Sequence, residues 1–219
     1  MPPPRRVHDL TATLQSYMPV WPTSPLPVIE PVGFVARDGY AIERINCLTH
    51  TGTHMDAPSH FLEDGATIDQ IPPERLVGTA AVLDVRSEIE GSIIPAKSLA
   101  KRWPRGKHPE VVLLRTGWSR ERAPTAHYLY EFPGIDPEGA EWLVKQSIQG
   151  VGTDTLGIDP FANQKFEAHK ALLRRGIWIL EALDHLDELV EGEEYTLIAA
   201  PLKIAGGSGA MARVFAIES

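Results

Sequence analysis

Three of the chain's eight histidines lie in one short stretch, HTGTHMDAPSH, at positions 50–60. His50, His54 and His60 share it with Asp56. Two imidazoles and one carboxylate suit a divalent metal ion and leave one coordination position open for water, as in catalytic rather than structural zinc sites. Such an ion lowers the pKa of the bound water to about 7, which makes hydroxide available in neutral solution. His60 lies past the proline of this stretch and need not be a ligand, so it could deliver or accept a proton.

The spacing of these residues predicts a bend in the backbone at Gly52. On a helix, His50 and His54 would share a face, but Asp56 would point away from it. On a flat strand the Cα atoms of His50 and His54 would lie about 13 Å apart, at roughly 3.3 Å per residue. That separation strains two imidazoles that must each approach one zinc ion to about 2.0–2.1 Å. Glycine bends the chain at the lowest steric cost. Asp56 has two oxygens and could also bridge a second ion.

Residues 50–60 resemble the signature of the cyclase-like family of metal-dependent hydrolases, which includes bacterial kynurenine formamidase and isatin hydrolase. The signature reads histidine, any residue, Gly-Thr-His, any residue, Asp, any residue, Pro, any residue, His, and this chain matches every fixed position. The resemblance covers nearly the whole chain. Its other segments are HDLTATL, PVWP, DGATIDQIPPERLVG, GVGTDTLGID and PLKIAGGSGAMARVFAI.

The resemblance implies one or two metal ions per chain, zinc or alternatively manganese, and gives His60 the acid/base role. The implied ligands are three residues of the motif and two later residues, with Asp56 shared between the ions: His50, His54, Asp56, His169 and Glu181. On the residues alone, Glu181 interrupts the apolar stretch IWILEAL, and a buried carboxylate is costly unless it is paired or metal-bound. A salt bridge of Glu181 and a surface position of His169 on its helix remain the alternatives.

Two aromatic residues are candidates for substrate contacts. The resemblance places Trp21 over the substrate ring, where stacking would select an aryl amide. A position at the rim of the core is the alternative for Trp21. Phe61 could line the same pocket or pack into the core. Asp154 and Asp159 are candidates for hydrogen bonds that orient metal ligands, although Asp159 also precedes a proline, as in an ordinary turn.

Three residues depart from the formamidase pattern. Thr23 and Ser24 follow Trp-Pro where Gly-Asp is usual, and Ser208 stands where aspartate is common. None is an implied ligand, so we expect the departures to affect the substrate and not hydrolysis. The resemblance implies a metal-dependent hydrolase of small aryl amides, first an arylformamidase of tryptophan catabolism that converts N-formylkynurenine to kynurenine and formate. A cyclic amide or lactone hydrolase of the isatin hydrolase type is the alternative, followed by a non-catalytic metal-binding homologue.

The elements that must position these residues alternate through the middle of the chain. Five prolines exclude a helix from residues 17–34. Expected strands are 40–50, 79–85, 110–118, 150–155, 177–183 and two within 195–218; expected helices are one turn in 71–78, then 92–103, 136–147 and 165–176. This order predicts an α/β fold with a mixed sheet curled toward a barrel and surrounded by helices. The resemblance implies a swivelling β/β/α-like domain, and with no linker in sight we expect one domain over 1–219.

Composition restricts the partners. The 219 residues are 43% hydrophobic and 23% charged, with a net charge of −8 and no basic run, so we expect a small-molecule substrate and no nucleic acid. No window approaches eighteen apolar residues, and the N-terminus lacks the apolar stretch of a secretory signal, so we expect no membrane span and a cytoplasmic location. Cys47, the only cysteine, excludes an intrachain disulfide, and we expect it to be buried in a strand. The resemblance implies a homo-oligomer, a dimer or tetramer, with the N-terminal arm as an exchanged element.

Overall fold

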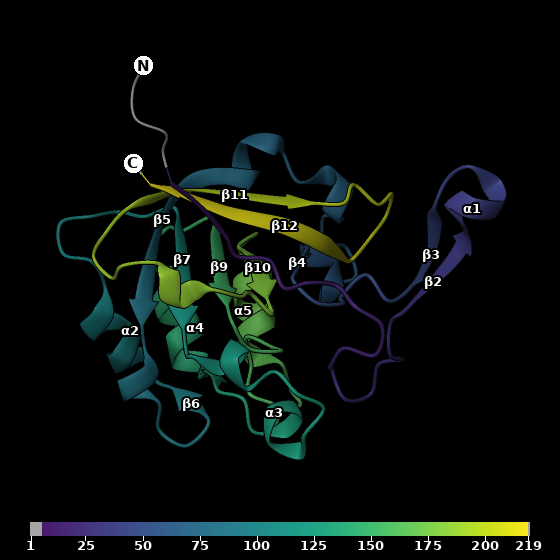
Figure 1. The fold of residues 1–219 in the computed structure, drawn as a ribbon. Coiled ribbons are helices and arrows are strands. Elements are labelled where there is room, and N and C mark those ends of the chain that lie inside the picture. The colour runs from purple at the N-terminus through teal and green to yellow at the C-terminus, as the bar shows by residue number, and fades with distance from the viewer. Residues whose placement is uncertain (1–5, 219) are drawn as a thin grey trace.

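A closed, mixed sheet of seven strands forms the centre of the protein in the computed structural model, which describes residues 6–218 (Figure 1). Around the barrel the order is β12, β11, β5, β7, β9, β10 and β4, and β4 pairs with β12 to close it. The strands are β4 (His54–Asp56), β5 (Val77–Asp84), β7 (Val111–Arg115), β9 (Gly150–Thr153), β10 (Trp178–Glu181), β11 (Tyr195–Pro201) and β12 (Gly209–Glu218). An eighth strand, β1 (Val7–Asp9), lies along β12. The predicted mixed sheet curled toward a barrel is confirmed.

The four central strands β5, β7, β9 and β10 run parallel, and their side chains alternate between two cores. Along β7, Val111 and Leu113 fill the interior of the barrel, while Val112 and Leu114 face the surrounding helices. Three helices cover this outer face: α2 (Ala96–Arg102), α4 (Pro137–Val144) and α5 (Glu167–Arg174). Strands that are buried on both faces explain why their sequences are almost continuously apolar.

Local signals account for the ends of these helices. Asp136 caps α4 by accepting a hydrogen bond from the Gly139 N–H at 2.6 Å, at the start of the helix expected over 136–147. Gly176 follows α5 in a left-handed conformation with φ +69°, which confirms the expected stop there. Pro95 is the N-cap of α2, so this helix begins later than the expected range of 92–103. None of the helices in residues 6–218 has the length and apolar character needed to cross a bilayer.

Short elements connect this frame. They are β6 (Ile93–Ile94), β8 (Gly134–Ile135), α3 (Ala126–Tyr130) and 3-10 turns at Pro58–His60, Ile68–Gln70, Pro73–Leu76, Arg86–Glu88, Trp118–Glu121 and Leu186–Glu188. The turn at Pro73–Leu76 is the one expected within 71–78. Residues 1–5, part of the N-terminal stretch in which we expect no secretory signal, lie outside the described residues.

A hairpin of β2 (Val28–Gly33) and β3 (Ile42–Asn46), with the one-turn helix α1 (Val35–Asp38) at its tip, projects from the body of the protein (Figure 1). The proline-rich segment that leads into it contains no helix, as predicted. Every residue of β3 is exposed. Cys47 lies just after β3 and is partly exposed, so its predicted burial in a strand is wrong.

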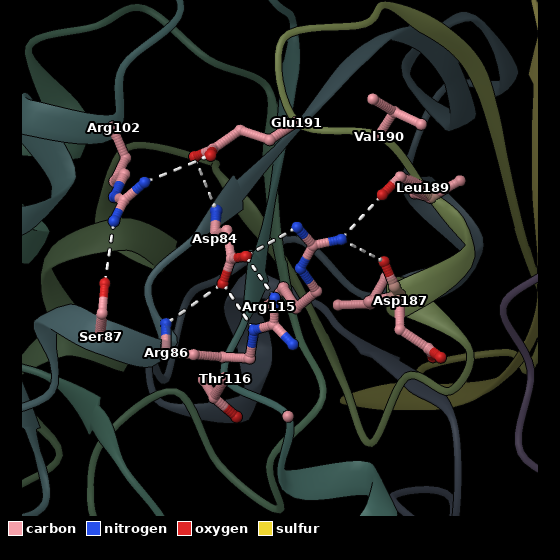
Figure 2. Close-up of polar contacts among 12 residues, drawn as sticks. Asp84, Arg86, Ser87, Arg102, Arg115, Thr116, Asp187, Leu189, Val190 and Glu191 are labelled. Carbon is pink, nitrogen blue, oxygen red and sulfur yellow. Dashed lines mark hydrogen bonds and ion pairs between the residues drawn. The ribbon is translucent and has the colours of Figure 1, made fainter.

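A group of arginine contacts, the arginine clamp, lies at the carboxyl ends of β5 and β7 (Figure 2). Arg115 donates to Asp84 Oδ2 at 2.8 Å and to the carbonyls of Leu186 and Leu189 at 3.2 and 2.7 Å. Arg86 donates to the second oxygen of Asp84 at 2.8 Å. The Asp84 and Arg115 side chains are only 17% and 9% exposed, so each needs the other's charge. The clamp ties the ends of β5 and β7 to the loop before β11.

Candidate metal centre

Pairing of β4 with both of its neighbours brings the predicted ligands together. In β4, His54 lies opposite Glu181 of β10, and Asp56 lies opposite Gly209 of β12. Because side chains alternate along a strand, Met55 enters the barrel core while His54 and Asp56 leave on the other face, where α5 packs. The site therefore lies between the sheet and α5, at the carboxyl end of β10.

The predicted bend at Gly52 is present and orients the first histidines. Gly52 has φ +62°, in the left-handed region that glycine adopts without strain. Its carbonyl oxygen lies 2.8 Å from His54 Nδ1, so His54 directs its other nitrogen, Nε2, at the carboxylates. Beside it, His50 Nδ1 lies 2.7 Å from Asp56 Oδ1. The bend lets both imidazoles meet one carboxylate.

All five implied ligands converge. His54 Nε2 lies 3.4 Å from Asp56 Oδ1 and 3.5 Å from Glu181 Oε2. His169 Nε2, which comes from α5, lies 3.0 Å from Glu181 Oε1 and 3.5 Å from Asp56 Oδ2. His50 completes the group through Asp56. His169 is buried, so the alternative of a surface position is wrong. The ion pairs of Glu181 with His54 and His169 fit the salt-bridge alternative as well as a metal role.

The donor atoms fit a divalent cation. The fully buried Asp56 Oδ2 has no hydrogen-bond partner among the described residues, a costly state for a carboxylate oxygen. One donor atom each from His54, Asp56 and Glu181 lies within 4.8 Å of the others, and the same holds for His50, Asp56 and His60. Imidazole nitrogens and carboxylate oxygens together suit zinc and manganese. Asp56 belongs to both sets and could bridge two ions.

Protons balance the charge of this cluster. Burial opposes a charge on His54, yet hydrogen bonding to Asp56 and the charges of Asp56 and Glu181 raise its pKa to about 9. Burial likewise opposes a charge on His169, but the Glu181 carboxylate and the hydrogen bond to Asp159 hold its pKa well above the usual value. Metal ligands must lose such protons on binding, so a cation would take over the role that these protons have.

Asp159 both caps α5 and orients His169. The N-cap residue of α5 is Phe166, whose ring cannot accept a hydrogen bond. Asp159 takes its place and accepts from the N–H groups of Ala168 and His169, each at 2.9 Å. Its Oδ2 also lies 2.6 Å from His169 Nδ1, which leaves Nε2 directed at the cluster. This is the carboxylate–histidine pairing that fixes a ligand's tautomer and orientation, and it matches the candidate role of Asp159.

The other candidate for this role, Asp154, is placed elsewhere. Its carboxylate accepts from the backbone and hydroxyl of Thr116 and from the Gly117 N–H, at 2.6–3.0 Å. These bonds hold the loop after β7 and none reaches a predicted ligand, so the candidate role of Asp154 is wrong. Both aspartates follow β9, and only the tertiary packing of α5 separates their roles.

Ser208 contacts a predicted ligand, contrary to our expectation that it would affect only the substrate. Its hydroxyl lies 2.9 Å from His50 Nε2. The neighbouring Gly209 leaves room for the His50 ring, since a Cβ there would lie 2.5 Å from His50 Cε1. Ser208 and Gly209 therefore determine where the His50 imidazole lies.

His60 stacks on His50 at the edge of the cluster. The two rings are 3.9 Å apart between centroids and inclined by 23°, and the Phe61 ring packs 4.4 Å from His60 on another side. Burial lowers the pKa of His60 to about 4, and the neighbouring imidazoles act in the same direction. The charge of Asp56 opposes this shift only in part. His60 is therefore neutral at pH 7 and can accept a proton, and its distance from Asp56 also allows it to act as a ligand.

A pocket of about 250 Å³ opens above the cluster. Trp21 and Phe61 line it, and both rings also pack against buried clusters, so the pocket and core positions considered for them occur together. Phe166, which the sequence did not indicate, is the third aromatic wall, with its ring 5.1 Å from Phe61 and 5.9 Å from Trp21. Its position at the start of α5, with φ +52°, turns its ring into the pocket and leaves capping to Asp159. The pocket joins an aromatic chamber to a group of metal-binding side chains.

Known proteins resemble this chain in sequence and in fold. Residues 8–160 match the Cyclase family model, described as "Putative cyclase". The kynurenine formamidase of Erythrobacter litoralis (strain HTCC2594) is 31% identical over 98% of this chain and 94% of its own length. Isatin hydrolase A from Labrenzia aggregata, solved with benzyl benzoate, superposes with a TM-score of 0.87 at 33% identity, over 98% of this chain and 94% of that one. A solved structure described as a potential metal-dependent hydrolase with cyclase activity gives 0.82 at 33% identity, over 99% of both chains.

Proposed function

This chain belongs to the cyclase family, and from that membership we propose that it is a metal-dependent hydrolase of small aryl amides. The observation that carries the proposal is the convergence of three imidazoles and two carboxylates at the floor of an aromatic pocket. The relatives support a hydrolase that acts on amides, since one is a kynurenine formamidase and others are isatin hydrolases.

We assign the metal ligands as the resemblance implies. His50, His54 and Asp56 would hold one ion, and Asp56 would share a second ion with His169 and Glu181. The donor atoms that lie within 4.8 Å of one another form two other sets, His54 with Asp56 and Glu181, and His50 with Asp56 and His60. When bound, a divalent ion, Zn²⁺ or Mn²⁺, supplies a Lewis acid that activates water and polarises the substrate carbonyl. The buried Asp56 Oδ2, which lacks a hydrogen-bond partner among the described residues, supports this ligand set.

The remaining pocket residues would carry the substrate and the proton. Trp21, Phe61 and Phe166 hold the aryl ring through stacking and edge contacts. His60, neutral at pH 7, accepts a proton from the attacking water and donates it to the departing nitrogen. The aromatic wall around the ring would hold the scissile carbonyl over the ligand cluster, which reduces the entropic cost of the reaction.

The first candidate reaction is that of an arylformamidase, in which water and N-formylkynurenine give kynurenine and formate. The curated kynurenine formamidases, which this chain matches along nearly its whole length, support it. The second candidate is opening of a cyclic amide such as isatin, in which the same attack breaks a ring C–N bond. The solved isatin hydrolases, with TM-scores of 0.87 and 0.88, support that alternative.

Turnover before and after metal removal tests the function. Protein stripped with a chelator, and the same protein reloaded with Zn²⁺ or Mn²⁺, are assayed on N-formylkynurenine and on isatin. We expect hydrolysis of one of them to vanish on stripping and return on reloading, and the ratio of the two rates identifies the reaction. A fully loaded protein that hydrolyses neither formanilides nor cyclic amides would refute the proposed function.

We propose a homodimer, one of the two oligomers that the resemblance implies, and the projecting hairpin supports it. Val35, Tyr40, Ile42 and Ile45 expose 49–67% of their surface on it, and an isolated two-stranded hairpin is marginally stable in water. A second copy that covers the hairpin would remove both problems. We expect Val35→Glu to convert a dimer into a monomer in light scattering, whereas Val190→Glu, at an equally exposed site off the hairpin, should not. A monomeric wild type would contradict this proposal.

A further inference from the structure

We propose that the pocket selects its substrate by a neutral aryl group and leaves a charged substituent unrecognised, with Ser24 as the residue that determines this specificity. The inference rests on the proposed function and narrows its substrate class. The evidence lies in the pocket wall above the metal-binding cluster, which determines what a substituent on the aryl ring can touch.

Among the described residues, the wall outside the cluster and His60 is mostly apolar and carries no charge. Its larger members are Val20, Trp21, Leu48, Phe61, Leu156 and Phe166, with glycines and Ala182 between them. Its polar groups are the Ser24 hydroxyl and the Trp21 indole N–H. No lysine or arginine lines this pocket, and the only carboxylate in its lining, Glu181, belongs to the cluster.

The aromatic part of the wall is held firmly. The Trp21 ring packs 5.3 Å from Phe161 and 5.9 Å from both Phe132 and Phe166, so it has little freedom to move aside for a larger polar group. A turn that follows Trp21 presents Ser24, whose N–H donates to the Trp21 carbonyl at 2.8 Å. The hydroxyl of Ser24 has no hydrogen-bond partner among the described residues, so it is available to a substrate group.

This wall offers no opposite charge to an amino-acid substituent such as the one on N-formylkynurenine. An ammonium or carboxylate inside the pocket would lose its hydration and gain no opposite charge, which is unfavourable. The substituent would therefore remain in solvent at the mouth and contribute little to binding. Neutral aryl amides fill the same aromatic wall and lose nothing, so they should be equally good substrates.

The test compares two substrates that differ only in the substituent. N-formylkynurenine carries the amino-acid group, and 2-formamidoacetophenone is the same aryl formamide without it. For the metal-loaded protein we expect kcat/KM for the neutral compound to lie within about tenfold of that for N-formylkynurenine, or above it. Ser24→Asp should raise the ratio of kcat/KM for N-formylkynurenine to kcat/KM for the neutral compound by about tenfold or more, because the new carboxylate can pair with the substrate's ammonium group. Ser24→Asn, of similar shape but neutral, should leave the ratio unchanged.

Binding of the products separates this inference from the function. Calorimetry on the same protein should show that 2-aminoacetophenone binds at least as tightly as kynurenine, whether or not either formamide is hydrolysed. If neither formamide is turned over but the binding order holds, the proposed function fails and the pocket selectivity stands. If kynurenine binds more than about a hundredfold tighter, or Ser24→Asp and Ser24→Asn shift the substrate ratio alike, the inference about Ser24 is overturned.

Discussion

Replacement of Asp159 by asparagine should weaken metal binding through His169, a proposed ligand that Asp159 orients through a hydrogen bond. The carboxylate is 1% exposed and accepts four hydrogen bonds, two on each oxygen. Oδ1 accepts from Asn163 and from the N–H of Ala168, while Oδ2 meets the N–H and Nδ1 of His169. In Asp159→Asn one of these oxygens becomes an amino group, which donates and cannot accept.

The structure sets the size of the effect. A hydrogen bond to a charged group contributes about 1.5–3 kcal/mol, so two lost bonds would cost about 3–6 kcal/mol if the structure did not relax. Because neighbouring groups can relax, we expect the free energy of unfolding to fall by about 3 kcal/mol. If the new amino group faces His169, Nδ1 must accept instead of donate, and the ring proton moves to Nε2, the nitrogen aimed at the cluster. The wrong tautomer opposes coordination, so affinity for Zn²⁺ should fall about 10- to 100-fold, the range typical of such partners.

Urea unfolding of the metal-free protein measures the first effect, and competition with a zinc chelator of known affinity measures the second. Asp154→Asn is the matched control, because Asp154 is equally buried and accepts three bonds from Thr116 and Gly117 but touches no predicted ligand. It should lose comparable stability and keep its zinc affinity. If the two variants bind zinc equally well, or are weakened equally, the orienting role of Asp159 is refuted.

Three further predictions test the site and its frame. His60→Ala should keep its metal in elemental analysis but lose about 10²-fold or more in kcat, whereas loss of the metal would make His60 a ligand. Gly52→Ala and Gly39→Ala should each lower the free energy of unfolding by about 1–2 kcal/mol, because both residues have positive φ. Only Gly52→Ala should also weaken zinc binding. Its Cβ would lie 3.3 Å from a methionine methyl, whereas a Cβ at Gly39 meets nothing within 4 Å. The hydrogen bond from Arg86 holds the pKa of Asp84 well below its usual range, so the stability that Asp84 contributes is present above about pH 4 and is lost as the pH falls further. The difference in unfolding free energy between wild type and Asp84→Asn should therefore be largest near neutral pH and shrink below about pH 4; a difference that stays constant would contradict this.

The motif predicted one half of the site because its geometry is local. The distance between His50 and His54 along the chain requires a bend, and Gly52 is the residue that can supply it. The polarity of Glu181 inside an apolar stretch was a second local signal, since an unpaired carboxylate does not belong in a buried strand. His169 had no such signal. It lies on an amphipathic helix, and its place in the site depends on the packing of α5 over β10. A local sequence pattern does not predict that packing.

The residues that the sequence missed or misplaced depend on tertiary packing. Phe166 begins a helix but is not a capping residue type, and its ring lies in the pocket while Asp159, earlier in the same loop, caps α5. Asp154 and Asp159 follow the same strand and look alike in sequence. Ser208 meets His50 because β12 pairs with β4, a contact between segments near opposite ends of the chain.

The strand that closes the barrel, β4, also carries two residues of the site. The closing strand β4 has three residues, which offer few backbone hydrogen bonds to hold β10 on one side and β12 on the other. Its outward side chains, His54 and Asp56, make the remaining connections, to Glu181 on β10 and to His169 on α5. A cation shared among these side chains would strengthen the seam where the backbone ladder is shortest. Metal binding and barrel closure are then thermodynamically linked, because the ligands meet only when β4 lies between its two neighbours.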